Sequence, residues 1–388
     1  MKQNSTTILK DFMTEFSSNT GLEPGSNHPK RYLWTDAFAV CNFLELYNRT
    51  SEKKYLNLAL RLIYQVHHIL GQYRTDNKKH GWISGLDIVE GENHPTQGGL
   101  RIGKEINERN PNEPFNERLE WDMDGQYYHY LTKWMHALNK TSLVTGNIKY
   151  LKWGMELAKT AHKHFTYLPN QSIRKRMYWK MSIDLNRALV PSMGQHDPLD
   201  GYITYNEIQS EMDNLDLIDK IENPLNYELK DMKNICMGMS MVTDDPLGIG
   251  GLLTDATLIT QLIDRGSNLF ELLETVLDSS LMGLRSYISD NPMGLSANYR
   301  LAFRELGLSI GLKGLVIIRD LIRNNSKFSR ESLENILNEL DKYSDLGETI
   351  EKFWLDENNR KTRNWIEHRD INTVMLATSL APWGFLKI

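Results

Sequence analysis

Repeated pairs of helical segments constrain the fold of this chain more than any other feature of its sequence. Within a pair, apolar residues recur at helical spacing, a short polar turn breaks the pattern, and a second helical segment follows. Five such pairs can be traced along the 388 residues: 34–47 with 53–70, 125–144 with 149–165, 205–221 with 226–241, 252–264 with 269–289, and 299–323 with 331–343. In addition, we expect the first helix, 8–16, to pair with the last, 372–380.

A helix pair of this kind cannot bury its apolar face alone, so neighbouring pairs must stack on one another. About six pairs can close into a ring, which removes the exposed ends. We therefore predict an all-α fold, an (α/α)6 toroid in which residues 1–388 form a single domain. The segment 176–183 alternates and is rich in large side chains, which predicts a minor amount of β-strand among the loops.

The links between pairs are long and chemically varied, whereas the turns within pairs are short. These links cover 72–124, 167–204, 243–251, 291–298 and 344–371. In an up-and-down ring they all emerge at the same end, so we expect one face to carry most of the loop sequence. Because functional residues concentrate on loops above a rigid scaffold, this face is where a site is expected.

Charge and composition exclude several classes of protein. With 45 basic and 50 acidic residues the net charge is -5, and the basic residues are scattered, so no nucleic-acid partner is expected. Cys41 and Cys236 lie within apolar helical pattern, which indicates buried thiols rather than disulfides or a zinc site. The most apolar stretch, 306–318, is short and contains Lys313, so no membrane span is expected. Because the N-terminus also lacks a secretory pattern, we expect a cytoplasmic location.

No cofactor or metal ion is expected either. The segment from Gly248 to Gly251 precedes a helix, but it follows no predicted strand and lacks the lysine of a phosphate-binding loop. The zinc-binding HExxH pattern and the calcium-binding loop pattern are both absent from the sequence.

The densest group of chemistry-bearing residues lies at 119–136, LEWDMDGQYYHYLTKWMH. We expect a helix to begin at Asp124, with Gln126 and His129 on a polar stripe that leads up to Asp122. Carboxylates gathered at a helix start in a water-poor cavity can have pKa values that are pulled apart, as an acid and base pair requires. The alternative is that Asp122 or Asp124 caps the helix and the stripe faces solvent.

Two further segments carry candidate residues. In 193–202, MGQHDPLDGY, turn chemistry explains the Asp-Pro and Asp-Gly pairs but not His196, and Asp197 is a candidate catalytic carboxylate. In the first long link, Trp82 and Arg101 could hold a flat polar ligand, although structural glycines explain the same stretch equally well. Tryptophans near helix starts favour a sugar site, because an indole ring can cover the apolar face of a pyranose, although core packing is the commoner explanation for any single tryptophan.

Two sequence segments, RYLWTDAFAVCNFLELYNRTSEKKYLNLA and TGNIKYLKWGMELA, resemble helix pairs of the six-hairpin glycosidase superfamily and the N-acylglucosamine 2-epimerase-like proteins. HGWISGLD is similar to the segment that follows the first hairpin in the epimerase-like group. The resemblance implies an (α/α)6 barrel with a carbohydrate cleft at the loop-rich end. Unsaturated glucuronyl hydrolases of this fold use aspartates, which Asp122 or Asp124 would match, and the epimerase-like proteins use histidines. No histidine lies between His196 and His368, so one epimerase role has no occupant here.

The first hypothesis is therefore a glycoside hydrolase that acts on a small or unsaturated oligosaccharide, with Asp122 or Asp124 as one catalytic carboxylate. These two residues are too close in sequence to flank a sugar ring easily. We expect the partner carboxylate from another helix pair, Asp36 or Asp197, far enough away to admit a water molecule and give inversion.

Two alternatives stay open. A sugar epimerase or isomerase would use His196 and His368 to exchange a proton next to a carbonyl group. A noncatalytic toroid would bind a carbohydrate or a protein partner, and a homo-oligomer is compatible with each hypothesis. In all of them, the residues expected to contact the ligand are Trp34, Asp36, Trp82, His94, Arg101, Trp121, Gln126, His129, His196 and His368.

Overall fold

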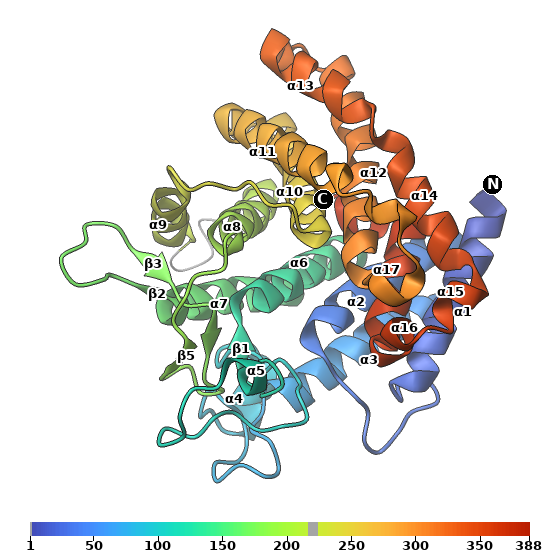
Figure 1. Cartoon of the computed structure of the whole chain (residues 1–388). Coiled ribbons are helices and arrows are strands. Elements are labelled where there is room, and N and C mark those ends of the chain that lie inside the picture. Colours follow the sequence, from blue (N-terminus) through green and yellow to red (C-terminus); the bar gives the residue numbers. More distant parts are fainter. Residues whose placement is uncertain (1, 216–223) are drawn as a thin grey trace. The chain divides into compact units, whose positions relative to one another are not determined.

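The structure of the protein is a computed structural model that describes residues 2–215 and 224–388. Its contacts divide the chain into two compact units. Unit 1 comprises Met1–Asn19, Asn48–Ser51 and Ser240–Ile388, and unit 2 comprises Thr20–Tyr47 and Glu52–Met239. Helices dominate both units, and the short strands of the described residues all lie in unit 2 (Figure 1). The expectation of a single domain stays a prediction.

The scaffold of unit 2 is formed by long helices. They are α2 (Leu33–Thr50), α3 (Lys53–Leu70), α6 (Tyr128–Thr145), α7 (Lys149–Phe165), α8 (Asp197–Asn214) and α9 (Asn226–Cys236). Neighbours along the chain form hairpins, because α6 packs against α7 and α8 packs against α9. α6 also packs against α8, so successive hairpins are stacked as the repeated pattern predicts.

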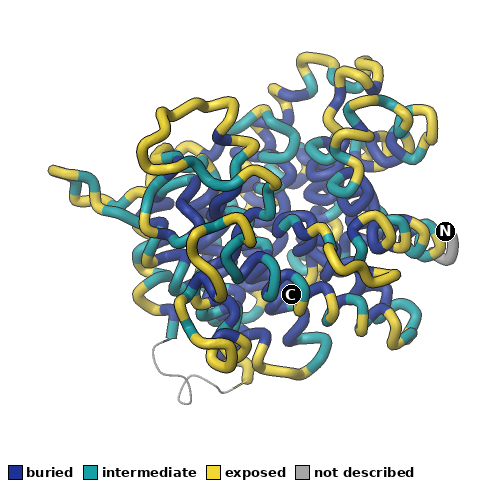
Figure 2. The backbone as a smooth tube through the Cα atoms, turned by 90° about the horizontal axis from the view of Figure 1, so that it is seen from below, coloured by how far each residue is buried: buried dark blue, intermediate teal, exposed yellow. Residues whose placement is uncertain are grey.

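The two helices of a hairpin differ in how they are buried. Leu131, Trp134 and Leu138 of α6 are fully buried and most of its circumference is covered, whereas on α7 the buried residues are interspersed with half-buried and exposed ones. A helix that is covered on all sides lies in a core, and an amphipathic helix packs onto it. α6 is therefore an inner helix and α7 an outer one. Figure 2 shows buried stretches along the long helices and many exposed loop segments, although parts of the first long link, such as residues 100–102, are buried as well.

Two small antiparallel sheets lie in the links of unit 2. The strands are β1 (Gln126–Tyr127), β2 (Thr166–Tyr167), β3 (Arg176–Met177), β4 (Lys180–Met181) and β5 (Ala188–Val190). One sheet has the order β1-β4-β5, and β2 pairs with β3 in the other. The minor amount of strand expected within 176–183 is thus present, as the two short strands β3 and β4, which belong to different sheets. Because β1 directly follows the first long link and β4 belongs to the second, the three-stranded sheet joins these two links.

Unit 1 contains the first helix and the C-terminal part of the chain. Its helices are α1 (Lys2–Asn19), α10 (Pro246–Asp264), α11 (Phe270–Ser289), α12 (Ala302–Asn324), α13 (Glu331–Asp341), α14 (Ser344–Leu355), α15 (Glu357–Arg360), α16 (Arg363–Glu367), α17 (Arg369–Leu380) and α18 (Trp383–Leu386). α10 packs against α11 and α12, and α12 packs against α17. α1 packs against α17, which confirms the expected pairing of the first helix with the segment 372–380.

The helix pairing predicted around α12 is wrong. We expected α12 to pair with the helix at 331–343, but α13 packs against α11, and it is α14 that packs against α12. The segment 344–371 is also no plain link, since it contains α14, α15 and α16. Ile350 and Trp354 of α14 are fully buried, so this helix has the apolar face that a partner of α12 requires.

Two helix starts differ from the expected positions. α6 begins at Tyr128 rather than at Asp124, because the two residues before it pair as β1. α8 begins at Asp197 rather than at residue 205, with Pro198 in its first turn, where a proline is tolerated because no amide hydrogen bond is lost. The end expected for that helix, 216–221, lies outside the described residues.

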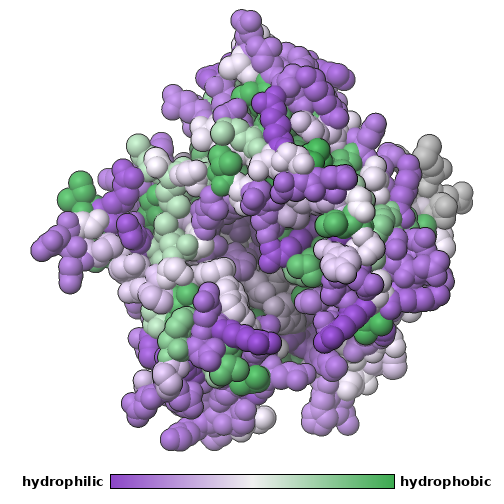
Figure 3. Space-filling model, in the orientation of Figure 1, coloured by the Kyte–Doolittle hydropathy of each residue, from purple (hydrophilic) through white to green (hydrophobic). Residues whose placement is uncertain are grey.

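The apolar segments and the thiols of the chain are largely buried. α10 is long and apolar enough to cross a membrane by length and composition, but 72% of its apolar window is buried inside the structure. That burial is typical of a core helix. Cys41 and Cys236 are both buried thiols, as expected. On the face shown in Figure 3, hydrophilic residues predominate and hydrophobic residues appear in smaller groups.

Candidate active site

The start of α8 places a carboxyl group in a buried position. Asp197 is the first residue of this helix and is only 5% exposed. Gly194 lies against the same carboxyl group, because a Cβ atom at residue 194 would be 2.5 Å from Asp197 Oδ2. The turn that precedes α8 therefore encloses the Asp197 carboxyl group, and it can do so because residue 194 has no side chain.

His129, on the first turn of α6, faces this carboxyl group. Its Nδ1 atom lies 3.6 Å from Asp197 Oδ1. Within the described residues, His129 Nδ1, Asp197 Oδ2 and the Tyr127 hydroxyl are buried and have no hydrogen-bond partner. Buried polar atoms are nearly always paired. Three unpaired ones in one cluster therefore indicate a place where a polar ligand can bind.

A second carboxylate of α8, Asp200, lies one turn further along and is fully engaged. It accepts hydrogen bonds from Thr132 Oγ1 at 2.9 Å and from Lys133 Nζ at 2.5 Å, both on α6. These bonds fix α8 to α6 and keep the Asp200 charge near Asp197. Asp200 is therefore part of the electrostatic environment of Asp197 rather than a second reacting group.

Burial and the neighbouring charge determine the protonation of the pair. Burial, assisted by the Asp200 carboxylate, raises the pKa of Asp197 to about 8, and Lys133 opposes the shift. Burial lowers the pKa of His129 to about 4. At neutral pH the site thus holds a protonated carboxyl group beside a neutral imidazole, which is a proton donor next to a proton acceptor.

Aromatic rings surround this pair, and together they form what we call the aromatic cluster: Tyr32, Trp34, Trp121, Tyr127, Tyr130 and Trp179. Between ring centroids, His129 lies 5.4 Å from Tyr127, 4.8 Å from Tyr130 and 6.4 Å from Trp179. Trp121 packs edge-on against Trp179 at 4.8 Å. The cluster thus places large apolar ring faces next to the two groups that can transfer a proton.

Asp122 lies on the turn between α5 (Glu117–Glu120) and β1. Its neighbour Trp121 is 40% exposed and belongs to the aromatic cluster, and Asp122 is exposed as well. Burial is the main cause that raises the pKa of Tyr127, and the Asp122 charge contributes to the same shift. Asp122 is therefore an exposed carboxylate within electrostatic range of the aromatic cluster.

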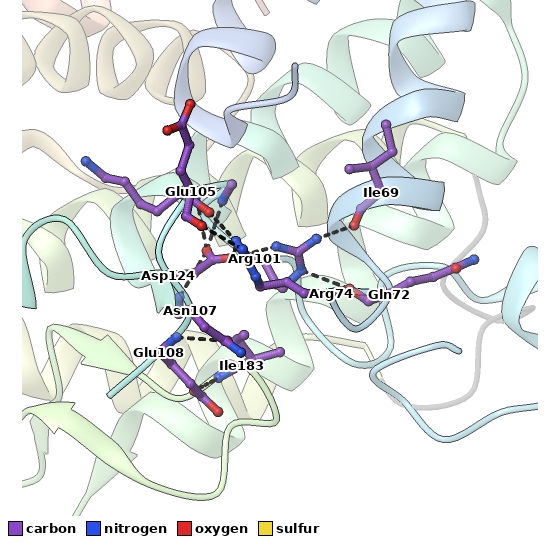
Figure 4. A network of polar contacts seen from close by, with 12 residues as sticks. Ile69, Gln72, Arg74, Arg101, Glu105, Asn107, Glu108, Asp124 and Ile183 are labelled. Carbon is purple, nitrogen blue, oxygen red and sulfur yellow. Dashed lines mark hydrogen bonds and ion pairs between the residues drawn. The ribbon is translucent and has the colours of Figure 1, made fainter. Parts of the chain in front are cut away.

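Asp124, the other carboxylate of this segment, has a structural role. Figure 4 shows it in a polar network with Arg101 and Arg74. Asp124 is fully buried, Arg101 donates to its Oδ2 atom, and the amides of Gly103 and Gly125 each donate to Oδ1 at 3.0 Å. Because both oxygens are occupied by guanidinium or amide groups, Asp124 is suited to hold the loops together and not to transfer protons.

Arg101 and Gln126, which we expected to contact a ligand, belong to the same loop scaffold. Arg101 also donates to the carbonyl oxygens of Ile69 at 2.7 Å and Gln72 at 2.8 Å. Gln126 is fully buried, and its side-chain amide donates to the carbonyl oxygen of Ile183 at 2.7 Å. Arg101 thus ties the first long link to the end of α3, and Gln126 ties β1 to the second long link, so these donors are used within the protein.

Asp36 and Trp82 are likewise occupied by local structure. Asp36 is buried at the start of α2 and accepts a hydrogen bond from the Tyr32 amide at 3.0 Å. Trp82 is buried, and a Cβ atom at Gly91 would lie 2.1 Å from its ring. Trp82 therefore fills the space beside α4 (Ile88–Asn93) instead of presenting a free face.

The remaining candidate histidines lie in different surroundings. His94 is paired with Glu156 of α7, with 2.6 Å between Nδ1 and Oε1. His196 directly precedes Asp197 at the start of α8. His368 belongs to unit 1, where its Nδ1 atom lies 3.1 Å from the carbonyl oxygen of Asn364, so its position is described only within that unit.

Four of the residues expected from the sequence meet around the aromatic cluster: Trp34, Trp121, His129 and Asp197. Sequence reasoning missed Trp179, although a signal was present. The alternating segment 176–183 predicts a strand, and a strand presents every second side chain on one face. Which segment that face meets is decided by the pairing of β4 with β1, and the alternation alone does not specify that pairing.

No protein-family model and no curated protein matches the chain, but solved structures do. A D-mannose isomerase matches with a TM-score of 0.53 and 12% identity, over 98% of this chain and 98% of that one. A GH76 alpha-mannanase from Bacteroides thetaiotaomicron matches with a TM-score of 0.54 and 9% identity, over 96% and 95%. A GH76A alpha-1,6-mannanase from a Salegentibacter species matches with a TM-score of 0.52 and 11% identity, over 97% and 99%.

These likenesses cover nearly the whole of each chain. The chain has the (α/α)6 toroid fold. The all-α fold class predicted from the repeated helix pairs is thus confirmed, and so is the fold implied by the resemblance to the six-hairpin proteins. At these identities the likeness shows the fold alone, because one scaffold hosts many chemistries.

Proposed function

We propose that this chain is a carbohydrate-active enzyme, a glycoside hydrolase in which Asp197 acts as the general acid. One observation carries the proposal. The buried Asp197 carboxyl group has an unpaired oxygen, lies 3.6 Å from the His129 imidazole, and has a pKa of about 8. A glycosidase requires a carboxyl group with a raised pKa, because its acid must give a proton to the leaving oxygen of the sugar.

The aromatic cluster supports a carbohydrate as the ligand. Trp121 is partly exposed and packs against Trp179, so the two indoles offer apolar surface beside polar atoms that have no partner. A pyranose has an apolar face and a rim of hydroxyl groups, which is the complement of such a site. The solved structures of the same fold are named as a mannose isomerase and as mannanases, which agrees with a small carbohydrate substrate. A cytoplasmic location stays a prediction.

The second carboxylate that a hydrolase needs is best supplied by Asp122. Asp124 and Asp200 are both engaged in ion pairs, whereas Asp122 is exposed beside Trp121. An inverting enzyme holds its two carboxyl groups roughly 6.5 to 9.5 Å apart so that a water molecule fits between them. We assign to Asp122 the activation of that water, and to His129 the orientation of the Asp197 carboxyl group.

A sugar isomerase or epimerase is the second candidate, and the His129–Asp197 pair favours it. A neutral imidazole next to a protonated carboxyl group could take a proton from a carbon beside a carbonyl group and return one to the other face. In this isomerase or epimerase hypothesis the proton is exchanged by His129 and Asp197, instead of by His196 and His368 as expected from the sequence. A purely binding toroid gains nothing from a buried carboxyl group whose pKa is raised, because that burial costs stability at neutral pH.

An NMR screen in heavy water separates the three readings. The purified protein is mixed with neutral mono- and oligosaccharides, and the anomeric and ring-proton signals are followed with time. A hydrolase produces new reducing-end signals, an isomerase or epimerase exchanges a ring proton for deuterium, and a binding protein only broadens the sugar lines. Absence of cleavage with any sugar that binds would contradict the hydrolase proposal.

The rate of hydrolysis should fall as the pH rises through about 8. Only the protonated Asp197 can donate a proton, and the pKa of Asp197 is raised to about 8 by burial and by Asp200, against the opposing charge of Lys133. The activity is therefore present below this pKa and lost above it. A kcat profile measured from about pH 6 to about pH 10 checks this. A rate that stays constant over the alkaline limb, with sugar binding also unchanged, would contradict the assignment.

Replacing Gly194 by alanine should displace the Asp197 carboxyl group. The added Cβ atom would lie 2.5 Å from Asp197 Oδ2, so the carboxyl group must move, while the backbone of residue 194 is not in the left-handed region. We expect kcat to fall by about 100-fold for a displacement of about 1 Å. Gly251→Ala is the matched control, because a Cβ atom there meets nothing within 4 Å. Equal kcat values for the two variants would show that the carboxyl position is not critical.

A further inference from the structure

Lys180 of β4 is a fully buried cation whose hydrogen-bonding capacity is used completely. Its ammonium group donates to the carbonyl oxygen of Glu120 at 2.5 Å, to Glu120 Oε1 at 3.0 Å, and to the carbonyl oxygen of Met123 at 2.8 Å. The exposed fraction of the Lys180 side chain is 0%. An ammonium group has three donors, so this lysine is satisfied by one short segment of the chain.

The two carbonyl oxygens that Lys180 binds flank the exposed pair Trp121 and Asp122. One belongs to the residue before the pair and the other to the residue after it. The same lysine lies opposite Tyr127 in the pairing of β1 with β4, and its ammonium group is 5.5 Å from the Tyr127 ring centroid. Lys180 thus contacts both the turn that carries Asp122 and the aromatic cluster.

Two neighbouring residues are adapted to this arrangement. Gly125 has a φ of +145°, and a Cβ atom there would lie 3.0 Å from Lys180 Cε and 2.7 Å from the carbonyl oxygen of Met181. The lysine stem can therefore pass only because residue 125 is a glycine. The second oxygen of Glu120 accepts a hydrogen bond from Arg109 Nε at 2.8 Å, so the carboxylate that Lys180 binds is itself held in place.

We infer that Lys180 is a positioning residue that holds the Trp121–Asp122 turn against the aromatic cluster, so that Asp122 faces the bound sugar. The inference rests on the proposed function, in which Asp122 activates water. Lys180 does not touch the substrate, because its three donors are used within the protein. Its effect on the rate passes through Asp122.

A double-mutant cycle on kcat tests whether Lys180 acts on the rate through Asp122. Lys180→Met keeps the length of the stem and removes the charge, and it should lower kcat by about 100-fold through misplacement of Asp122. Asp122→Asn should lower kcat by at least as much. If Lys180 acts through Asp122, the double variant is no slower than Asp122→Asn alone. Losses that multiply in the double variant would overturn the inference.

Lys313→Met is the matched control, because Lys313 is also a lysine bound to a carboxylate and a carbonyl oxygen, at Glu351 and Ser379 in unit 1. We expect Lys313→Met to lower the stability of the protein. Any change that it makes in kcat should be the same in the wild type and in Asp122→Asn. If Lys180→Met does not fold, Lys180→Gln takes its place in the same cycle, because glutamine also removes the charge but keeps side-chain N–H donors for the carbonyl oxygens.

Hydrogen exchange distinguishes a failure of this inference from a failure of the proposed function. The Asp122 amide donates to the carbonyl oxygen of Leu119 at 3.0 Å within the turn. In Lys180→Met this amide should exchange at least ten times faster than in the wild type, whether or not the protein cleaves sugars. Wild-type exchange at Asp122 in a folded variant would overturn the positioning role even if the hydrolase activity is found.

Discussion

Replacing Asp197 by asparagine is expected to lower kcat by about 100- to 10,000-fold, the contribution that a positioned proton donor makes to such a reaction. Asparagine has the size and shape of the protonated carboxyl group but no proton to give to a leaving oxygen. Sugar affinity should therefore change little, and steady-state kinetics with a parallel binding measurement separate the two effects. Asp213→Asn is the matched control, because Asp213 is an exposed carboxylate on the same helix, α8.

The same substitution should leave the protein at least as stable as the wild type at neutral pH. The folded pKa of Asp197 is raised from its ordinary value to about 8, so the folded state binds a proton that the unfolded chain has released. The stability of the wild type therefore falls as the pH rises towards 8, and asparagine removes this dependence. Lower stability of Asp197→Asn at neutral pH, or full activity, would contradict our assignment of a buried acid.

Replacing Asp124 by alanine is expected to act on stability instead. The change leaves the buried Arg101 guanidinium without its carboxylate and two loop amides without an acceptor. Removing one partner of a buried ion pair costs about 3 to 5 kcal/mol, because the other charge stays buried. Chemical denaturation followed by circular dichroism measures this free energy of unfolding.

The matched control for this experiment is Asp122→Ala, two residues away. Asp122 is exposed, so its removal should change the free energy of unfolding by no more than about 0.5 kcal/mol. We thus expect the loss of Asp124 to lower stability and the loss of Asp122 to lower activity. An Asp124→Ala protein of wild-type stability, or an Asp122→Ala protein of wild-type activity, would contradict this division.

The helical scaffold could be predicted because its determinants are local. The apolar spacing that marks α2, α3, α6 and α7 depends on neighbouring residues alone, and these helices lie within a few residues of the expected positions. The partner of α12 could not be predicted in this way. α13 and α14 both carry an apolar face, and tertiary packing decides which of them covers α12.

The candidate site was harder to predict, because its residues come from helix starts and from two links that are far apart in sequence. Asp122 and Asp124 look alike in the sequence. Asp124 is structural because it binds the Arg101 guanidinium, more than twenty residues away, together with the amides of Gly103 and Gly125. Trp179 and Lys180 enter the site through the pairing of β4 with β1, a long-range contact that strand periodicity does not specify. Asp197 could be proposed from its loop, but its raised pKa depends on burial and on Asp200.

The most direct test of the central claim, that Asp197 protonates the leaving group, compares two substrates in the Asp197→Asn variant. The first is an oligosaccharide that the wild type cleaves, and the second is the dinitrophenyl glycoside of the same sugar, whose leaving group departs without a proton. Asp197→Asn should lose about 100- to 10,000-fold in kcat on the oligosaccharide and retain most of its kcat on the aryl glycoside. An equal loss on both substrates would show that Asp197 is not the general acid.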